Sequence, residues 1–253
     1  NVMTLGSYAF AGCTRLTTLS VDMVGTIGEG AFDGCINVTS ITIGDEVTTI
    51  NAYAFRNTMI TEIVVPDNVT GIGVGVFQGC PLVSITVPFI GNAATTASTT
   101  AGVFGYIFGY TATWHGGTVM TSAGAGYTSQ IYYNSDMYNY YIPSTLRHVT
   151  ITKDTTIPYC AFNKCDLIET ITLPKNVEWI DGNAFLDCTA LQSVDMSFDV
   201  LTTIGNSAFQ NCPSLVRIGD VEKTISIPSN VVTLGSYAFA GCTKFVTVTV
   251  DMV

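Results

Sequence analysis

The chain has 253 residues, of which 47% are hydrophobic and only 11% are charged. Nine Lys and Arg stand against nineteen Asp and Glu, and the net charge of -10 excludes the basic surface that nucleic acids and anionic lipids require. No stretch approaches the ~20 consecutive apolar residues of a membrane-spanning helix, so we expect neither a nucleic-acid partner nor a membrane span in this segment.

The sequence repeats itself. An apolar residue followed by Phe, two spacers and usually Cys occurs eight times, and successive Phe residues lie 22, 23, 22, 85, 23, 24 and 30 positions apart. A spacing of about 20 to 30 residues is typical of a solenoid, in which each unit buries its apolar edge only against its neighbours. We therefore expect one continuous solenoid domain over residues 1–253. The eight residues are Phe10, Phe32, Phe55, Phe77, Phe162, Phe185, Phe209 and Phe239.

Each unit combines two apolar patterns. After the Cys, apolar residues stand two apart among Thr and Ser, which predicts a short strand with one buried face. The preceding IxxxAF pattern is too short for a stable isolated helix and predicts a single helical or 3-10 turn. The predicted inward pairs are Leu19 and Val21, Ile41 and Ile43, Ile63 and Val65, Ile85 and Val87, Val149 and Ile151, Ile171 and Leu173, Val194 and Met196, Val248 and Val250, with Ile218 as a ninth, weaker member.

The two ends of the chain are in phase with each other. Residues 1–24 and 230–253 share 18 identities, and no polar capping element is visible at either end. We expect flanking repeats to be missing at both ends. Uncapped ends also predict possible head-to-tail self-association between molecules.

One coil is expanded by an insertion at residues 89–145. This segment has one acidic residue, no Lys or Arg, and eight of the twelve Tyr residues of the chain. Tyr and Trp beside Ser, Gly and Asn are typical of recognition surfaces. For Phe104, Tyr106, Phe108 and Tyr110, packing of a hairpin against the solenoid is the favoured interpretation. The candidate ligand contacts are Trp114, Tyr127, Tyr132, Tyr133, Tyr138, Tyr140 and Tyr141.

The outward strand positions are mostly Thr and Ser, which predicts a flat face rich in hydroxyl groups. Stacked Thr residues are favourable cross-strand neighbours, so stability alone would account for them. A weak polar contact surface is the alternative.

The sequence offers little for catalysis or metal binding. Seven of the eight Cys residues occupy one position of the repeat, which predicts buried free thiols, and only Cys160 falls elsewhere. There is no CxxC motif, the only histidines are His115 and His148, and no nucleophile motif surrounds any Ser. We expect no catalytic residue, no metal and no cofactor.

The repeat resembles the BspA-like, or Treponema-type, leucine-rich repeats of bacterial and protist surface proteins. The resemblance rests on IGEGAFDGCINVTSITI at residues 27–43 and IDGNAFLDCTALQSVDM at residues 180–196. It implies a curved right-handed coil with short parallel strands on one face and short helical or 3-10 turns on the other. Asn57, Thr58, Val76 and Asp154 depart from the pattern and are expected to pack less regularly.

The resemblance also implies a function. It predicts a non-enzymatic, cell-surface or secreted module for adhesion or for binding a protein or glycan on a host or neighbouring cell. The alternative is a passive spacer with no ligand of its own. A glycosidase is a third hypothesis, but the sequence singles out no pair of carboxylates for it.

Overall fold

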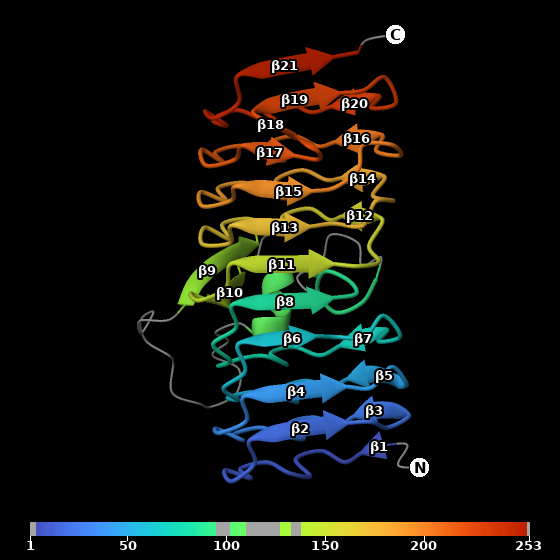
Figure 1. The fold of residues 1–253 in the computed structure, drawn as a ribbon, viewed down its shortest axis with the longest axis vertical. Helices are drawn as coiled ribbons and strands as arrows, with labels where there is room; N and C mark the ends of the chain where they lie inside the picture. The colour runs from blue at the N-terminus through green and yellow to red at the C-terminus, as the bar shows by residue number, and fades with distance from the viewer. Residues whose placement is uncertain (1–3, 95–101, 110–126, 133–137, 252–253) are drawn as a thin grey trace.

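The chain winds into a column of stacked coils in a computed structural model that describes residues 4–94, 102–109, 127–132 and 138–251 (Figure 1). Each coil contributes one strand to a main sheet, and the apolar side chains of consecutive coils lie over one another inside the column. The predicted repeat solenoid is confirmed.

The main sheet is a row of strands side by side along the column, which divides into three hydrogen-bonded sheets: β2-β4, β6 to β17, and β19-β21. Its pairs are parallel and in register, so that Ile85 lies beside Val149 and Val149 beside Ile171. The strands are β2 (Thr18–Val21), β4 (Ser40–Ile43), β6 (Glu62–Val64), β8 (Ser84–Val87), β11 (His148–Ile151), β13 (Thr170–Thr172), β15 (Ser193–Asp195), β17 (Arg217–Ile218), β19 (Thr224–Ile227) and β21 (Thr247–Val250).

The predicted inward residues of this sheet are buried through most of the column. In the last coil the prediction is wrong, because Val248 and Val250 are 62% and 44% exposed where no further coil covers them in the described chain. The 30-residue step before Phe239 contains β18 (Val221–Glu222), which pairs antiparallel with β17, and β19, which pairs with β21 in a separate two-stranded sheet.

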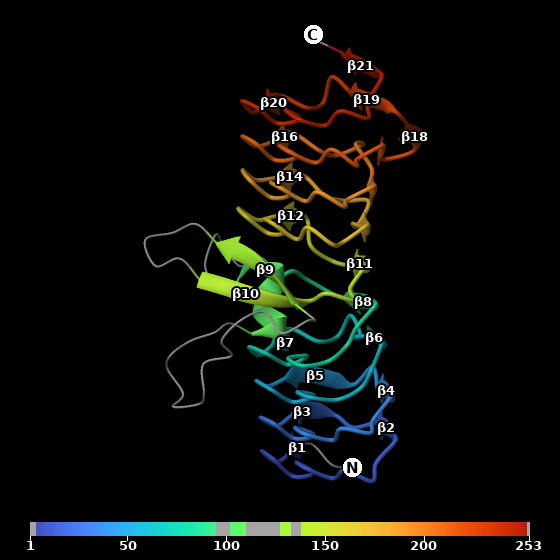
Figure 2. The same ribbon diagram turned by 90° about the vertical axis from the view of Figure 1, so that its left-hand side faces the viewer.

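A second row of short parallel strands lies behind the main sheet (Figures 1 and 2). It has two parts, β1-β3-β5-β7 and β12-β14-β16-β20. The strands are β1 (Thr4–Leu5), β3 (Gly25–Ile27), β5 (Val47–Ile50), β7 (Gly71–Ile72), β12 (Thr156–Ile157), β14 (Trp179–Ile180), β16 (Thr203–Ile204) and β20 (Thr233–Leu234).

The AF segments are successive tight turns, so the predicted helical or 3-10 turn of the ordinary repeat is wrong. In one coil the N–H groups of Ala31, Asp33 and Cys35 each donate to the carbonyl three residues earlier. The residues two before and two after the Phe have positive φ, as at Gly30 and Gly34, which breaks the helical path. Asn57 and Asn183 hold the same conformation in other coils, since Asn tolerates it better than most residues.

The Phe rings form two continuous stacks. Ring centroids of consecutive coils lie 4.7 to 6.0 Å apart with interplanar angles of 2 to 11°. Before the last coil, the main-chain N–H of each of these Phe residues donates to the next segment of the column, for example from Phe185 to the Ala208 carbonyl at 2.7 Å. Neighbouring coils are therefore held in one alignment both by the stacked Phe rings and by backbone hydrogen bonds.

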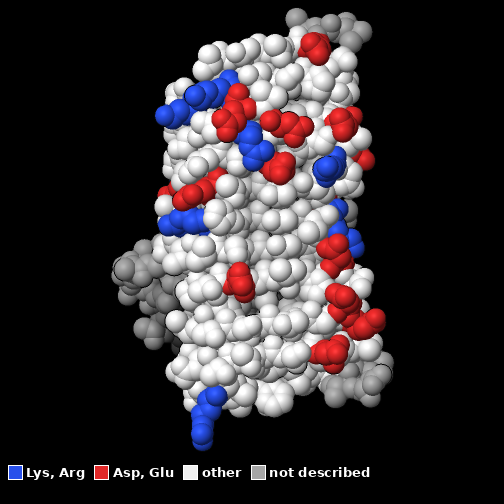
Figure 3. Space-filling model, viewed as in Figure 1, with Lys and Arg blue, Asp and Glu red and all other residues white. Residues whose placement is uncertain are grey.

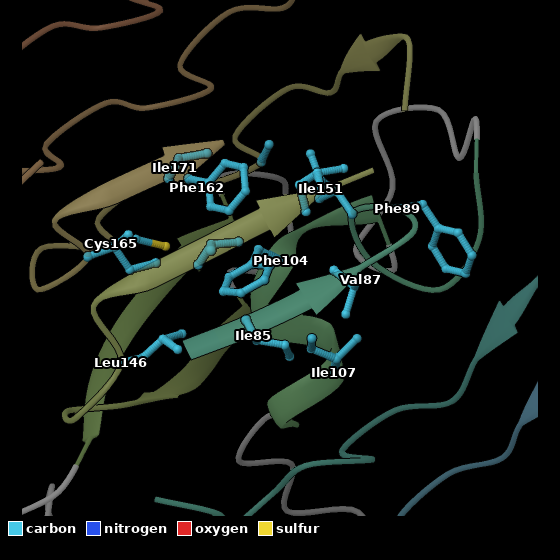
Figure 4. Close-up of a cluster of buried hydrophobic side chains, with 14 of the residues drawn as sticks. Ile85, Val87, Phe89, Phe104, Ile107, Leu146, Ile151, Phe162, Cys165 and Ile171 are labelled. Atoms are coloured by element: carbon cyan, nitrogen blue, oxygen red, sulfur yellow. The ribbon is translucent and has the colours of Figure 1, made fainter. Parts of the chain in front are cut away.

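The 3-10 helix η2 (Phe104–Phe108) fills the gap between the two stacks (Figure 4). Phe77 donates its N–H to the Ile107 carbonyl, and Phe104 donates its own to the Ala161 carbonyl. The Phe104 ring lies 5.0 Å from that of Phe162. The prediction of packing is thus confirmed for Phe104 and Phe108, which are buried, while the hairpin expected there is wrong. Tyr110 lies outside the described residues.

Three of the four departures from the repeat pattern are buried, whereas Asn57 is exposed. Thr58 and Val76 are fully buried, and the Thr58 hydroxyl donates to the Phe55 carbonyl at 3.0 Å. Asp154 is 5% exposed, and its carboxylate accepts a hydrogen bond from the Ile90 N–H at 2.6 Å. Side-chain acceptors and donors thus compensate locally for the lost repeat residues.

Candidate interaction surfaces

The outer side of the main sheet is a regular array of hydroxyl groups. In-register pairing places Thr86, Thr150 and Thr172 in one row. A parallel row runs through Ser84, His148 and Thr170, and His148 Nδ1 lies 2.8 Å from Thr170 Oγ1. Strand spacing of ~4.8 Å makes these rows nearly continuous. The predicted hydroxyl face is present.

This face carries few charges. From β6 to β17, the charged residues at outward strand positions are Glu62, Asp195 and Arg217. Figure 3 shows the centre of the face almost free of charge, with acidic and basic side chains gathered toward the C-terminal end and along both edges. A protein of net charge -10 therefore presents a broad neutral surface.

The aromatic insertion forms a hairpin that leaves the column on another side. The strands β9 (Tyr127–Tyr132) and β10 (Tyr138–Pro143) pair antiparallel, with Tyr138 opposite Tyr132 and Tyr140 opposite Gln130. Figure 2 shows the hairpin extending beyond the column, away from the strands of the main sheet.

The seven predicted contact residues have different positions in this hairpin. Trp114 and Tyr133 lie outside the described residues, and only the backbone is described for Tyr127, Tyr132 and Tyr138. Tyr141 is half-buried, whereas Tyr140 is 1% exposed and packs with Val103 and Cys160. The structure thus brings five of the seven predicted residues onto one hairpin and shows the ring of one, Tyr140, facing the protein itself.

Cys160, which packs with Tyr140 of the hairpin, could have been noticed in the sequence. Tyr53, Asn183 and Ser207 occupy the repeat position of Cys160 and are partly exposed, yet Cys160 is fully buried. Asn163 is likewise fully buried, although its counterparts in other coils are not. The one signal in the sequence was that Cys160 does not occupy the repeat position shared by the other seven Cys residues.

The remaining cysteines are structural. All eight are free, and the Sγ atoms of Cys35, Cys80, Cys188, Cys212 and Cys242 donate to the Phe carbonyl of an adjacent coil at 3.0 to 3.2 Å. Burial raises the pKa of Cys80 to about 11 and also raises the pKa of Cys188. Cys80 and Cys188 are therefore held in the weakly reactive protonated form.

Within the described ranges, no group of three or more His, Cys, Asp and Glu side chains could hold a metal ion. No helix in that part of the chain is long and apolar enough to cross a membrane. His115 lies outside the described residues, and His148 is an exposed residue of β11.

One solved structure shows a similar fold, and two others match at lower structural similarity. A leucine-rich repeat protein from Bacteroides ovatus is similar over 97% of this chain with 22% identity and a TM-score of 0.56; the chain spans 51% of that protein. A leucine rich cell surface protein from Faecalibacterium prausnitzii matches 98% of this chain and 63% of its own length, with 24% identity and a TM-score of 0.35. The pneumococcal vaccine antigen PcpA matches over 99% and 54%, with 17% identity and a TM-score of 0.37.

A search among curated proteins found no match. The sequence itself matches the family described as "BspA type Leucine rich repeat region" in six copies, over residues 1–99, 128–242 and 219–252. Together with the stacked coils, parallel strands and Phe columns, this match shows that the chain belongs to the BspA-type leucine-rich repeat family.

Proposed function

We propose that this protein is a non-enzymatic recognition module, exposed at a cell surface or secreted, that binds a protein or glycan. The observation that carries the proposal is the neutral hydroxyl face on a rigid column. Its rows are fixed by in-register pairing of β8, β11 and β13, so a ligand can bind without ordering the protein first.

The chemistry of this face favours a polar, uncharged ligand surface. Hydroxyl groups donate and accept hydrogen bonds, and the rows carry few charged groups that would require an ionic partner. The F. prausnitzii protein is described as a cell surface protein, which agrees with the proposed location. The aromatic hairpin offers a second contact area on another side of the column.

Binding screens with neutral glycans and extracellular-matrix proteins test the proposal. Replacing Thr150 and Thr172 together with Glu should weaken any binding found by at least about tenfold, because an unpaired charge would be buried at the contact. The matched control replaces Thr156 and Thr233 with Glu on the second row of strands, where both residues are exposed.

Excision of residues 110–139 separates the contribution of the hairpin. The Tyr141 N–H donates to the Gly109 carbonyl at 3.2 Å, so a short Gly linker can close the gap. Retained binding would assign the ligand to the main face, and loss of binding would assign it to the hairpin. A passive spacer predicts that no partner is found in either screen, which would overturn the proposal.

A further inference from the structure

The second row of strands carries nearly the same residue at every outward position. Figure 2 shows β12, β14 and β16 of this row one above another, on the side of the column away from the main sheet. The outward residues of the row are Thr4, Thr26, Thr49, Gly71, Thr156, Trp179, Thr203 and Thr233. In-register pairing places Trp179 of β14 directly between Thr156 of β12 and Thr203 of β16. A single large ring thus interrupts a row of small residues.

Trp179 is exposed at a position where the fold does not require an aromatic ring. Its side chain is 50% exposed, whereas Trp side chains are highly buried on average. The neighbouring Ile180 anchors the strand, because it is fully buried and lies beside Ile157 and Ile204. Thr occupies the position of Trp179 in both adjoining strands with the same pairing. The indole ring is therefore available for a contact outside the column.

Polar groups lie around the ring. Thr156 is exposed and Thr203 is partly exposed, and each lies one strand spacing of ~4.8 Å from Trp179. The exposed Glu178 comes directly before Trp179, and the partly exposed Asp181 follows two positions after it. Hydroxyl groups donate and accept hydrogen bonds, and carboxylates accept them. The surface thus combines one apolar plane with hydroxyl groups on both sides and carboxylates along the same coil.

The charge and composition of this surface limit the ligand that fits it. Asp181 Oδ1 accepts a hydrogen bond from the Gly182 N–H at 2.6 Å, which holds this carboxylate beside β14. Asp181 and Glu178 repel an anionic ligand, and the net charge of -10 adds to that repulsion. A protein interface has an apolar centre of several side chains, whereas the in-register neighbours of Trp179 are Thr. These features favour a neutral ligand rich in hydroxyl groups.

We propose that Trp179, Thr156 and Thr203 form a binding site for a linear neutral glycan. One face of a pyranose ring consists of C–H groups with partial positive charge, which are attracted to the negative face of the indole ring. The sugar hydroxyl groups then meet Thr side chains on both sides, because a sugar residue is about as long as one strand spacing. The site lies on another side of the column from the hydroxyl face of the main sheet, so the two surfaces bind independently.

Calorimetric titration of the full chain with cellohexaose, mannohexaose and maltohexaose tests the proposal, and hexagalacturonate is the anionic counterpart. At least one neutral hexaose should bind, and hexagalacturonate should not. The chain has two Trp residues, Trp114 and Trp179. In the Trp114→Phe variant the indole emission comes from Trp179 alone. Bound glycan should shift this emission and shield the ring from quenching by acrylamide.

Trp179→Thr is the main variant, because it removes the ring and restores the residue that both adjoining strands carry. It should melt at the temperature of the unmodified protein and bind the neutral hexaose at least about tenfold more weakly, as expected for a central Trp contact. Trp179→Tyr keeps an aromatic face and should retain most of the affinity. Thr156→Glu beside the ring should also weaken binding, whereas Thr150→Glu with Thr172→Glu on the main sheet should leave it unchanged.

Unchanged affinity in a folded Trp179→Thr variant would overturn the proposal. If Thr150→Glu with Thr172→Glu abolished that binding instead, the glycan would belong to the main sheet, and the proposed recognition function would stand without a site at Trp179. A lack of binding to all three neutral hexaoses, or tighter binding of hexagalacturonate, would also exclude this site. Neither result would affect a partner protein found on the main sheet.

Discussion

Each interior Phe lies between two others, and its ring fills a slot that no neighbouring group can occupy. Phe185 is fully buried, with ring centroids 5.4 Å from Phe162 and 4.7 Å from Phe209. Phe185→Ala should lower the free energy of unfolding by about 3 to 5 kcal/mol through the cavity it leaves. Urea denaturation measures the change. Phe10→Ala is the control, because Phe10 is 44% exposed, and an equal loss there would contradict the packing argument.

The buried thiols make stability depend on alkaline pH. The pKa of Cys80 is raised to about 11 by burial, above its ordinary value of 9.0. Between these values the unfolded chain loses a proton that the folded chain retains, so the contribution of this thiol is complete below pH 9 and falls as pH rises toward 11. For one buried thiol the loss is about 2 to 3 kcal/mol.

Denaturant titrations at several pH values measure this effect. The Cys80→Ala variant should be less stable at neutral pH but should lose less stability between pH 9 and 11 than the unmodified chain. The difference between the two proteins isolates Cys80 from the Tyr and Lys residues that titrate in the same range. Parallel curves for the two proteins would show that the thiol is not responsible.

At the scale of the element, the turn after β7 depends on close approach of two backbones. A Cβ atom at Gly73 would lie 2.1 Å from the Ala52 nitrogen, while one at Gly71 would meet only a Thr49 methyl at 3.7 Å. Gly73→Ala should therefore cost about 1 to 3 kcal/mol of unfolding free energy. Gly71→Ala, two residues away, should be neutral or slightly stabilising. Thermal melts measure the stability of both variants. Equal melting temperatures for Gly73→Ala and Gly71→Ala would contradict the close approach at Gly73.

The strands could be predicted from the sequence, because alternating apolar residues specify a half-buried strand wherever neighbours cover one face. The turns could not be predicted. They depend on residues with positive φ, such as Gly30 and Gly34, and no pattern of apolar residues indicates that conformation. The 3-10 helix could not be predicted either, because its sequence matches the repeat pattern only in part. Gly102-Val103-Phe104 repeats the letters of Gly75-Val76-Phe77, but no Cys follows three residues after Phe104.

The candidate site was predictable in composition and not in geometry. The many Tyr residues of the insertion predicted a recognition surface. Whether a given ring faces the column or the solvent depends on the pairing of β10 and on the column residues that the ring meets. Tyr140 illustrates this, because Cys160 and Val103 that bury it are 20 and 37 residues away.

At the scale of the whole molecule, the last coil leaves large apolar side chains uncovered. Val232 and Val246 are each 80% exposed, and Tyr237 is 70% exposed. Head-to-tail contact between copies of this chain would cover them against the first coil, whose sequence is nearly the same. Light scattering should show a mass that rises with concentration, and Val246→Asp together with Val248→Asp should abolish the rise. A monomeric mass at every concentration would exclude self-association.

The column as a whole depends on equivalent side chains lying over one another in consecutive coils. Excision of one full period should preserve that register, whereas excision of half a period should destroy it. Deleting residues 163–185 joins Phe162 to Leu186 and restores the AF-x-x-C pattern. Deleting residues 163–173 removes part of a coil and brings a strand segment out of phase.

The most direct measurement is urea unfolding of these two variants, followed by far-ultraviolet circular dichroism. The full-period deletion should keep the native strand signal and unfold cooperatively with a smaller m-value, because one coil fewer is exposed on unfolding. The half-period deletion should lose both the signal and the cooperative transition. Equal behaviour of the two variants would contradict the stacked solenoid.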